Sequence, residues 1–213
     1  MNVLITAGPT REYLDDVRYL SNASTGRMGY ALAAAAKAAG NRVTLVHGPT
    51  AEAPPAVDKA IAVTSAREMF DAVAAEFPAC DALIACAAVS DYRPKERIGG
   101  KLKRESAEAL TLTLVQNPDI AREMAARRRA DQAVICFALE TDDGEANARA
   151  KLARKGADAI VLNMASAIGA DETEITVFLA GPAAAETFRG SKAEAAQLIL
   201  AIAERIVEAK SRD

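Results

Sequence analysis

The chain alternates short runs of aliphatic and β-branched residues with longer alanine-rich stretches. The short runs predict strands, and the longer stretches, in which apolar residues recur at helical spacing, predict helices. Strands are predicted at Asn2–Thr6, Arg42–Val46, Ala60–Val63, Ala82–Ala87, Ala133–Phe137 and Ala159–Leu162. Helices are predicted at about Met28–Ala39, Ala66–Phe77, Asp119–Arg129, Glu145–Lys155 and Lys192–Lys210. This alternation is typical of a mainly parallel sheet covered by helices, so we expect a Rossmann-like three-layer α/β/α sandwich.

Capping signals support several of the helix starts. Ser65 with Glu68, and Ser191 with Glu194, each have the spacing of a capping box. In Asn117–Asp119, a cap residue, a first-turn proline and an acidic residue follow one another in the order that favours a helix start.

Four segments do not fit a simple alternation of strands and helices. The loop Gly8–Thr25 is much longer than an ordinary turn between a strand and a helix, and such long loops are commonly functional. Val89–Arg104 is a second polar excursion, and Leu110–Val115 and Ile175–Leu179 each predict an extra strand. We therefore expect extra strands or a flap beside the main sheet.

Composition narrows the class of protein. A length of 213 residues predicts one domain spanning residues 1–213. Apolar residues make up 51% of the chain but aromatic residues only 4%, so the core must be filled by close contact of small side chains. A net charge of -3 argues against non-specific binding to nucleic acid, and no apolar run is long enough to span a membrane.

Cysteine usage predicts a reducing compartment. The three cysteines, Cys80, Cys86 and Cys136, lack the spacing of a metal site, and the chain has one histidine. This pattern disfavours both a disulfide framework and a zinc site. The apolar run Met1–Ala7 is too short for a signal peptide, so we expect a cytoplasmic protein.

Ligands of open α/β sheets bind beyond the carboxyl ends of the strands, so the residues that follow each strand are the candidates for a site. The first strand is followed by the long loop, which ends with Gly26 and Gly29 at the start of a helix. Free backbone N–H groups at such a position suit an anion. The alternative is that the two glycines only allow the helix to pack closely on the sheet.

The fourth strand is followed by a run of very small side chains. A flat ring could lie against the backbone of Ala85–Ala88, with Asp91 at the mouth of the strand; alternatively, the small residues only accommodate a crossing helix. Cys86 is not expected to be a nucleophile, because the sole histidine, His47, follows a different strand and no second base is evident.

Lysines complete the candidate site. Lys101, Lys151 and Lys155, together with the helix start at Asn117–Asp119, provide the positive charge that a triphosphate requires. The alternative for Lys151 and Lys155 is a solvated helix face. A dehydrogenase is disfavoured because no G-x-G-x-x-G run is present and no ribose-binding acid follows the second strand. The residues alone thus predict a nucleotide or another phosphate-bearing ligand.

Six motifs, in order, resemble those of phosphopantothenate–cysteine ligase. They are Leu4–Glu12, Ser21–Asn22 with Gly26–Gly29, Ala87–Pro94, Lys101–Arg104, Asn117–Ile120 and the Lys151/Lys155 pair. The resemblance runs from Asn2 to about Asn163 and ends with Ser191–Lys192. It implies a homodimeric enzyme of coenzyme A synthesis that joins 4'-phosphopantothenate to L-cysteine. Because the motifs begin at Asn2, we expect the ligase without the flavin-dependent decarboxylase that many relatives carry, and no flavin.

The resemblance also implies a mechanism and a set of site residues. CTP activates the substrate carboxylate as an acyl-cytidylate with loss of pyrophosphate, in the presence of Mg²⁺, and the amine of cysteine then attacks. Asn22 and Lys101 match the catalytic positions, and Asn22, Gly26, Ala87 and Ala88 match the substrate site. The nucleotide positions are Ala85, Cys86, Ala87, Asp91, Lys101, Pro118, Asp119, Ile120, Ala121, Phe137, Lys151 and Lys155.

Some features depart from the family pattern. Tyr13, Arg27 and Leu139 replace the usual residues, and the match is poorer around Gly181–Gly190. The choice between CTP and ATP stays open, as does the metal ligand, for which Asp91 and Asp119 are the candidates. Two alternative functions also stay open: another Rossmann-like nucleotide-binding enzyme, and a non-catalytic nucleotide-binding protein.

Overall fold

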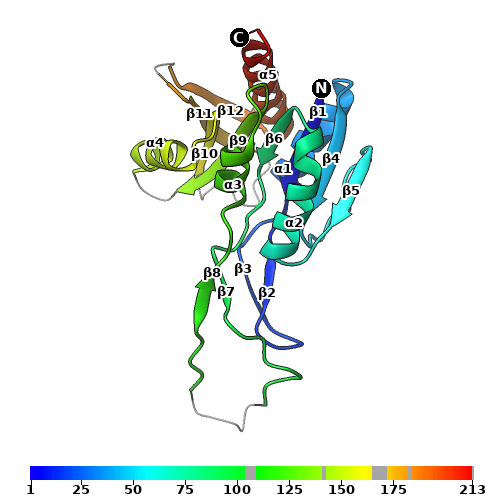
Figure 1. Cartoon of the computed structure of the whole chain (residues 1–213), viewed down its shortest axis with the longest axis vertical. Helices are drawn as coiled ribbons and strands as arrows, with labels where there is room; N and C mark the ends of the chain where they lie inside the picture. Colours follow the sequence, from blue (N-terminus) through cyan, green and yellow to red (C-terminus); the bar gives the residue numbers. More distant parts are fainter. Residues whose placement is uncertain (104–108, 141–142, 165–171, 182–183, 213) are drawn as a thin grey trace.

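The computed structural model describes residues 1–103, 109–140, 143–164, 172–181 and 184–212. Its centre is an eight-stranded sheet in the order β12-β11-β10-β9-β6-β1-β4-β5 (Figure 1). The six strands from β10 to β5 are parallel, and β11 and β12 extend the sheet in antiparallel fashion. This arrangement confirms the expected α/β sandwich with a mainly parallel sheet and extra strands.

The observed elements agree with most of the predicted ones. The strands of the main sheet are β1 (Asn2–Ala7), β4 (Arg42–His47), β5 (Lys59–Ala62), β6 (Ala82–Ala85), β9 (Ala133–Glu140), β10 (Ala159–Met164), β11 (Glu172–Leu179) and β12 (Glu186–Ser191). The helices are α1 (Arg27–Ala38), α2 (Ala66–Glu76), α3 (Ile120–Arg127), α4 (Gly144–Lys155) and α5 (Lys192–Lys210), with a 3₁₀ turn at Phe77–Ala79. Among the described residues, no helix is long and apolar enough to cross a membrane.

Helix starts follow the local chemistry that the sequence indicates, with one correction. Ser65 and Ser191 each form a complete capping box at the start of α2 and α5. The cap of α3 is Asp119, whose side chain accepts a hydrogen bond from the N–H of Arg122, and not Asn117 as expected. Asn117 instead uses its Nδ2 to donate to the carbonyl of Ser90, so it ties the α3 entry to the loop after β6.

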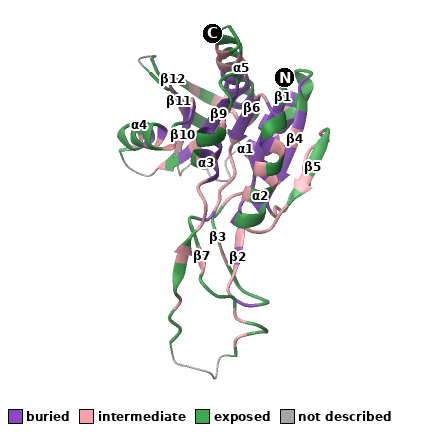
Figure 2. Ribbon diagram, in the orientation of Figure 1, coloured by how far each residue is buried: buried purple, intermediate pink, exposed green. Residues whose placement is uncertain are grey.

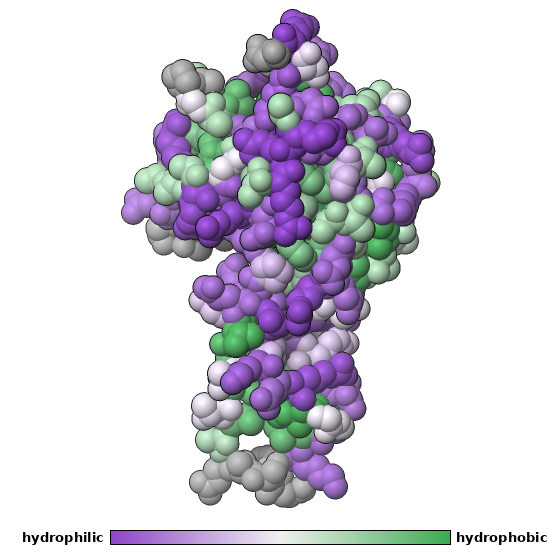
Figure 3. Space-filling view, viewed as in Figure 1, coloured by the Kyte–Doolittle hydropathy of each residue, from purple (hydrophilic) through white to green (hydrophobic). Residues whose placement is uncertain are grey.

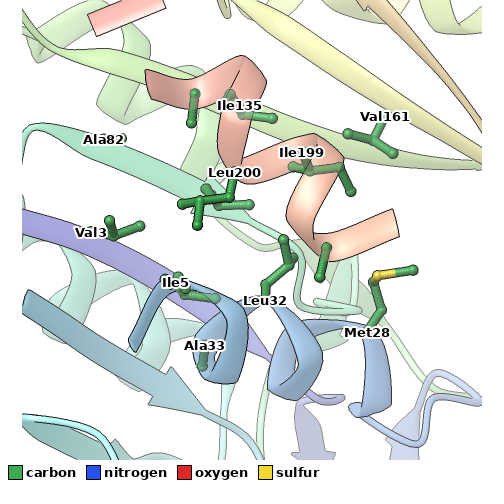
Figure 4. Packing of buried hydrophobic residues seen from close by; sticks show 14 of the residues in the cluster. Val3, Ile5, Met28, Leu32, Ala33, Ala82, Ile135, Val161, Ile199 and Leu200 are labelled. Carbon is green, nitrogen blue, oxygen red and sulfur yellow. The ribbon is translucent and has the colours of Figure 1, made fainter. Parts of the chain in front are cut away.

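Each face of the sheet buries its own apolar cluster. α1 and α5 cover one face and pack against each other, whereas α2, α3 and α4 cover the other face. Figure 4 shows Ile199 and Leu200 from α5 facing Leu32 from α1 above the sheet residues. Figure 2 shows the buried residues concentrated in this sandwich. Burying each such aliphatic side chain stabilises the fold by about 1.5–3 kcal/mol, so the helices hold the strand ends in fixed positions.

Strand β6 is shorter than the predicted Ala82–Ala87. The N–H of Cys86 turns back to the carbonyl of Ile84, at 3.1 Å, and leaves the ladder. The N–H of Ala87 then donates to Oγ1 of the buried Thr6, at 3.1 Å. Two residues that were expected in the strand, Cys86 and Ala87, therefore lie half-buried beyond the end of β6.

A two-part arm projects from this end of the sheet (Figure 1). One hairpin pairs β2 (Arg11–Tyr13) with β3 (Tyr19–Ser21), and the other pairs β7 (Tyr92–Pro94) with β8 (Leu114–Gln116). We use the name arm for residues 11–21 and 92–116 as far as they are described. Figure 3 shows apolar residues on the surface of the arm. The exposed large apolar side chains of the arm are Val17, Tyr19, Tyr92, Leu110 and Leu114.

The arm explains the irregular segments of the sequence. Hydrogen bonds join the two hairpins, from the N–H of Ile98 to the carbonyl of Leu14 and from the N–H of Gly100 to the carboxylate of Asp16. The strand predicted at Leu110–Val115 is confined to Leu114–Gln116, and β12 was not predicted. Strands as short as those of the arm carry little hydrophobic periodicity, so their pairing partners, which are distant in sequence, determine them.

Candidate active site

Two adjoining pockets open at the carboxyl ends of β6 and β9. The first, of about 470 Å³, lies against the start of α1, and the second, of about 300 Å³, lies against α3 and α4. We call them the α1 compartment and the α3 compartment. They share a wall made of Ala87, Val89, Asp91, Phe137, Ala138 and Leu139. Ligands in the two compartments would therefore meet across one short stretch of mostly small or apolar residues.

The α1 compartment is lined by the end of the long loop and by the turn after β6. Gly26 caps α1 in a left-handed conformation (φ 77°), and Gly29 contacts β1 so closely that a Cβ there would lie 2.5 Å from the Cβ of Ala7. The close-packing hypothesis is thus confirmed for Gly29. Because Gly26 lines the compartment, the start of the helix also faces the cavity, as the anion hypothesis requires.

Asn22 fastens the long loop to the shared wall. Its Nδ2 donates to the carbonyl oxygens of Ala88, at 3.3 Å, and Val89, at 3.0 Å. In this position the amide hydrogens are occupied by main-chain acceptors, while the carboxamide still lines the α1 compartment. Asn22 can donate to a substrate only if it leaves one of these carbonyls.

The buried side chain of Thr10 stabilises the shared wall on the side away from the compartments. Oγ1 of Thr10 accepts a hydrogen bond from the N–H of Ser90 at 3.0 Å, and the N–H of Ala88 donates to the carbonyl of Gly8 at 2.9 Å. Thr10 is fully buried. The loops after β1 and β6 therefore form one hydrogen-bonded unit, which fixes the backbone that faces the compartments.

The α3 compartment is the more strongly charged of the two. Lys151 and Lys155, one turn apart on α4, line it together with Arg154, opposite the start of α3. Nζ of Lys155 lies 2.6 Å from both carboxylate oxygens of Asp119, and Nζ of Lys151 lies 2.5 Å from Oε1 of Glu140. The lysines therefore face a cavity and not a solvated helix surface alone.

Cys86, the cysteine that lines the α1 compartment, is not in its reactive thiolate form at neutral pH. Burial raises the pKa of Cys86 to about 12, so its thiol stays protonated at neutral pH. All three cysteines are free thiols. This agrees with the expectation that Cys86 is not a nucleophile, because the thiolate is the reactive form.

Comparison with known proteins identifies the family of the chain. The family described as DNA/pantothenate metabolism flavoprotein C-terminal domain matches residues 1–207. The chain belongs to this family. The coenzyme A biosynthesis bifunctional protein CoaBC of Vibrio parahaemolyticus is 44% identical over 182 residues, covering 83% of this chain and 46% of that protein. CoaBC of Bacillus subtilis is 43% identical over 182 residues, covering 83% and 44%. The chain thus spans about half the length of the curated relatives it matches.

Two solved structures share the fold of this chain. The C-terminal domain of CoaBC superposes with a TM-score of 0.81 at 35% identity, covering 97% of both chains. A Cab2 variant in complex with phosphopantothenate-cysteine superposes with a TM-score of 0.80 at 17% identity, covering 100% of this chain and 89% of that one. At that identity, the second likeness shows the fold alone.

The structure brings together every predicted site residue of this family member except one. The α1 compartment is lined by Asn22, Gly26, Cys86, Ala87, Ala88, Asp91 and Phe137. The α3 compartment is lined by Ala85, Ala87, Asp91, Pro118, Asp119, Ile120, Ala121, Phe137, Lys151 and Lys155. Cys86, which was predicted as a nucleotide-binding residue, lines the α1 compartment and not the α3 compartment.

Lys101 is the exception. It lines neither compartment, and its neighbours Gly100 and Leu102 contact the loop between β2 and β3 of the arm. Its neighbours are held there, because the N–H of Leu102 donates to the carboxylate of Asp15 and the carbonyl of Gly100 accepts from the N–H of Asp16. Within one chain the structure does not place Lys101 at the site.

Several lining residues were not predicted as site residues. Arg27, Asn163 and Lys192 line the α1 compartment, and Arg154 lines the α3 compartment. Asn163 lies near the end of β10, so inspecting the carboxyl end of every strand would have found it. Lys192 follows the cap of α5, and only the fold shows that this helix begins beside the site.

The residues present fit a magnesium ion that is held mainly by the phosphates of a bound substrate, with one carboxylate from the protein. Among the described residues, no group of three His, Cys, Asp or Glu side chains could hold a metal ion. Asp91 offers one carboxylate on the shared wall, and no ion pair or hydrogen bond within the described parts of the chain uses it. Mg²⁺ characteristically binds through one or two carboxylates, several waters and the phosphates of a substrate.

Proposed function

We propose that the protein joins 4'-phosphopantothenate to L-cysteine in coenzyme A biosynthesis, with CTP as the activating nucleotide and an acyl-cytidylate as intermediate. The observation that carries the proposal is the pair of compartments that share a wall, one cationic and one beside the start of α1. Such a pair can hold a triphosphate and a carboxylate with their reacting atoms side by side, and this proximity is a large part of catalysis.

The comparisons support this proposal at the level of chemistry. The relatives are coenzyme A biosynthesis proteins, and the Cab2 variant with the same fold binds phosphopantothenate-cysteine. The matched region is the flavoprotein C-terminal domain, so the proposal assigns the ligase activity to residues 1–213 as one domain. The free cysteines support a cytoplasmic location, where thiols stay reduced.

The proposed reaction has two steps. The carboxylate oxygen of the substrate attacks the α-phosphorus of CTP, and the bond to the β-phosphate oxygen breaks to release pyrophosphate. The amine of cysteine then attacks the acyl carbon, and CMP leaves as the amine loses a proton. Lys151, Lys155 and the start of α3 would bind the phosphates, while Asn22 would donate to the carboxylate and to the oxyanion of the second step.

Asp91 is the proposed protein ligand for magnesium. Its side chain lies on the wall that the two compartments share, between the proposed positions of the substrate carboxylate and the nucleotide phosphates. Mg²⁺ bound there would neutralise phosphate charge and polarise the phosphoryl oxygens. Asp119 is less suited, because its Oδ1 caps α3 by accepting from the N–H of Arg122, and both of its oxygens bind Lys155 in the structure.

Lys101 enters the proposal together with the dimer. It can act on the intermediate only when an arm comes to a compartment, either by hinge movement in its own chain or from a second copy. The exposed apolar side chains of the arm support a homodimer, because surfaces of this kind are characteristic of protein interfaces. Gly99 and Gly100 provide the backbone freedom that a moving segment needs.

The test is product formation by the purified protein. Each of CTP, ATP, GTP and UTP is supplied with Mg²⁺, 4'-phosphopantothenate and L-cysteine, while pyrophosphate and the mass of the product are measured. We expect pyrophosphate only when phosphopantothenate is present, and the highest kcat/KM with CTP. Lys155→Gln should raise the KM for CTP, whereas Lys37→Gln, at an ion pair with Asp58 outside both compartments, should not. Absence of pyrophosphate with all four nucleotides would refute the proposed function.

A further inference from the structure

Each lysine of the α3 compartment is already bound to a carboxylate of the same chain. Lys151 binds Glu140, the last residue of β9, and Lys155 binds both oxygens of Asp119, the cap of α3. The carboxylates thus come from two elements other than the helix that carries the lysines. Lys151 and Lys155 are therefore each paired with a carboxylate of the same chain, while Arg154 adds a further positive charge to the compartment.

These pairs differ from the surface ion pairs of the same region. Arg149–Glu145 and Arg127–Glu123 are neighbours along a helix, with side chains between 46% and 68% exposed. By contrast, the Glu140 side chain is 13% exposed and that of Lys155 is 17% exposed. An ion pair with a partly desolvated member is stronger and better defined than an exposed one, and its members are costly to separate without a replacement.

We infer that Glu140 and Asp119 are internal counter-ions that hold the two lysines until the phosphates of a nucleotide replace them. The inference rests on the proposed function, which places the triphosphate in the α3 compartment. A phosphate oxygen and a carboxylate oxygen compete for the same ammonium hydrogens, so the ligand must displace the carboxylates before it can bind the lysines directly. The exchange keeps the lysines positioned in the empty protein, and it lowers the affinity for the phosphates.

Both carboxylates keep a second donor when the lysines leave. Oε2 of Glu140 accepts a hydrogen bond from Nδ2 of Asn147 at 3.4 Å. Oδ1 of Asp119 accepts from the N–H of Arg122 at 3.2 Å, in its role as helix cap. A carboxylate that retains a donor is less costly to separate from its cation, so the exchange can run in both directions as ligand binds and product leaves.

The decisive experiment removes one counter-ion and measures binding. Glu140→Gln leaves Lys151 without its anionic partner, so the affinity for CTP and for inorganic tripolyphosphate should rise about fivefold at constant ionic strength. Titration calorimetry measures both ligands. The matched control is Glu145→Gln, which removes the same charge from an exposed pair on α4 and should change the affinity less than about twofold.

A second measurement separates exchange from general electrostatics. In a Lys151→Gln background, Glu140→Gln should no longer raise the affinity, because the cation that it releases is absent. Asp119→Asn gives an independent test, since asparagine caps a helix as well as aspartate and the fold is preserved. It should raise tripolyphosphate affinity in the same direction as Glu140→Gln.

Unchanged or weaker binding by both single variants would overturn the inference, as would an equal gain in Glu145→Gln or a gain that persists in the Lys151→Gln background. So would a wild-type protein that binds neither CTP nor tripolyphosphate. The proposed function is judged separately, by product formation from phosphopantothenate and cysteine. If Glu140→Gln binds the phosphates more tightly but the wild-type protein forms no product, the counter-ion inference stands and the proposed ligase function is refuted.

Discussion

Gly29 is the position where one methyl group should disturb the site most directly. It lies in the first turn of α1, against the last residues of β1, and it lines the α1 compartment. A Cβ on Gly29 would meet the Cβ of Ala7 at 2.5 Å and the Cα of Ala7 at 2.9 Å. Ordinary contact is 3.4–4 Å, so in Gly29→Ala the start of α1 must retreat from the sheet by about 1 Å.

Two opposing effects determine the expected stability. Alanine is favoured over glycine within a helix by about 1 kcal/mol. Overpacking against a backbone atom costs about 3 kcal/mol, the upper part of the usual range, because a main-chain atom cannot rotate away. The net loss is about 2 kcal/mol, which corresponds to a fall in Tm of about 4–8 °C for a chain of this size. A displacement of 1 Å at the compartment should also lower kcat/KM by about 100-fold.

Thermal unfolding and ligase turnover measure the two effects. The control is Gly144→Ala at the start of α4, whose Cβ would meet the flexible end of Leu162 at 3.1 Å and the Cβ of Glu140 at an ordinary 3.7 Å, so that variant should be neutral or more stable. Adding Ala7→Gly to Gly29→Ala removes the 2.5 Å contact and should restore part of both properties. If Gly29→Ala is as stable as Gly144→Ala and fully active, the close contact does not control the site.

Three further changes test other parts of the molecule. Asn22→Asp should leave CTP binding nearly intact but lower product formation about 100-fold, because a carboxylate cannot donate to the oxyanion; an equal loss of CTP affinity in calorimetry would contradict that role. Lys101→Gln should let the acyl-nucleotide accumulate, and its absence in quenched-flow mass spectrometry, with normal turnover, would remove Lys101 from the mechanism. The N–H groups of Arg18 and Val17 lower the pKa of Asp15 below its usual 3.8, so the arm should be stable at neutral pH and open as the pH falls through that lowered pKa. Limited proteolysis measures this opening, and Asp15→Asn should already be cleaved more readily at pH 7.

The strands and helices of the sandwich were predictable because their signals are local. Ser65 and Ser191 set helix starts with their own side chains, and the apolar strands carry enough periodicity to be recognised. Strand β12 was missed because Glu186–Ser191 is mostly polar and takes its conformation from pairing with β11. Propensity does not report such pairing.

The candidate site was predictable where it follows the ends of strands. Ala87, Asp91 and Phe137 could be found from the rule that parallel strands deliver their carboxyl ends to one edge. Lys101 belongs to a different class, because its place depends on two hairpins that join across distant parts of the chain. The ion pairs of Lys151 and Lys155 likewise depend on distances between elements, which a sequence pattern does not contain.

The contact between α1 and α5 has a consequence for how the protein is made. These helices lie near opposite ends of the sequence, yet they pack on each other and on the same face of the sheet. During synthesis, the part of α1 that contacts α5 stays uncovered until Ile199 and Leu200 have left the ribosome. Contacts between distant segments slow folding and leave apolar surface open in partly folded chains. The nascent chain should therefore depend on chaperones until its last helix is complete, although the finished site lies beside its first one.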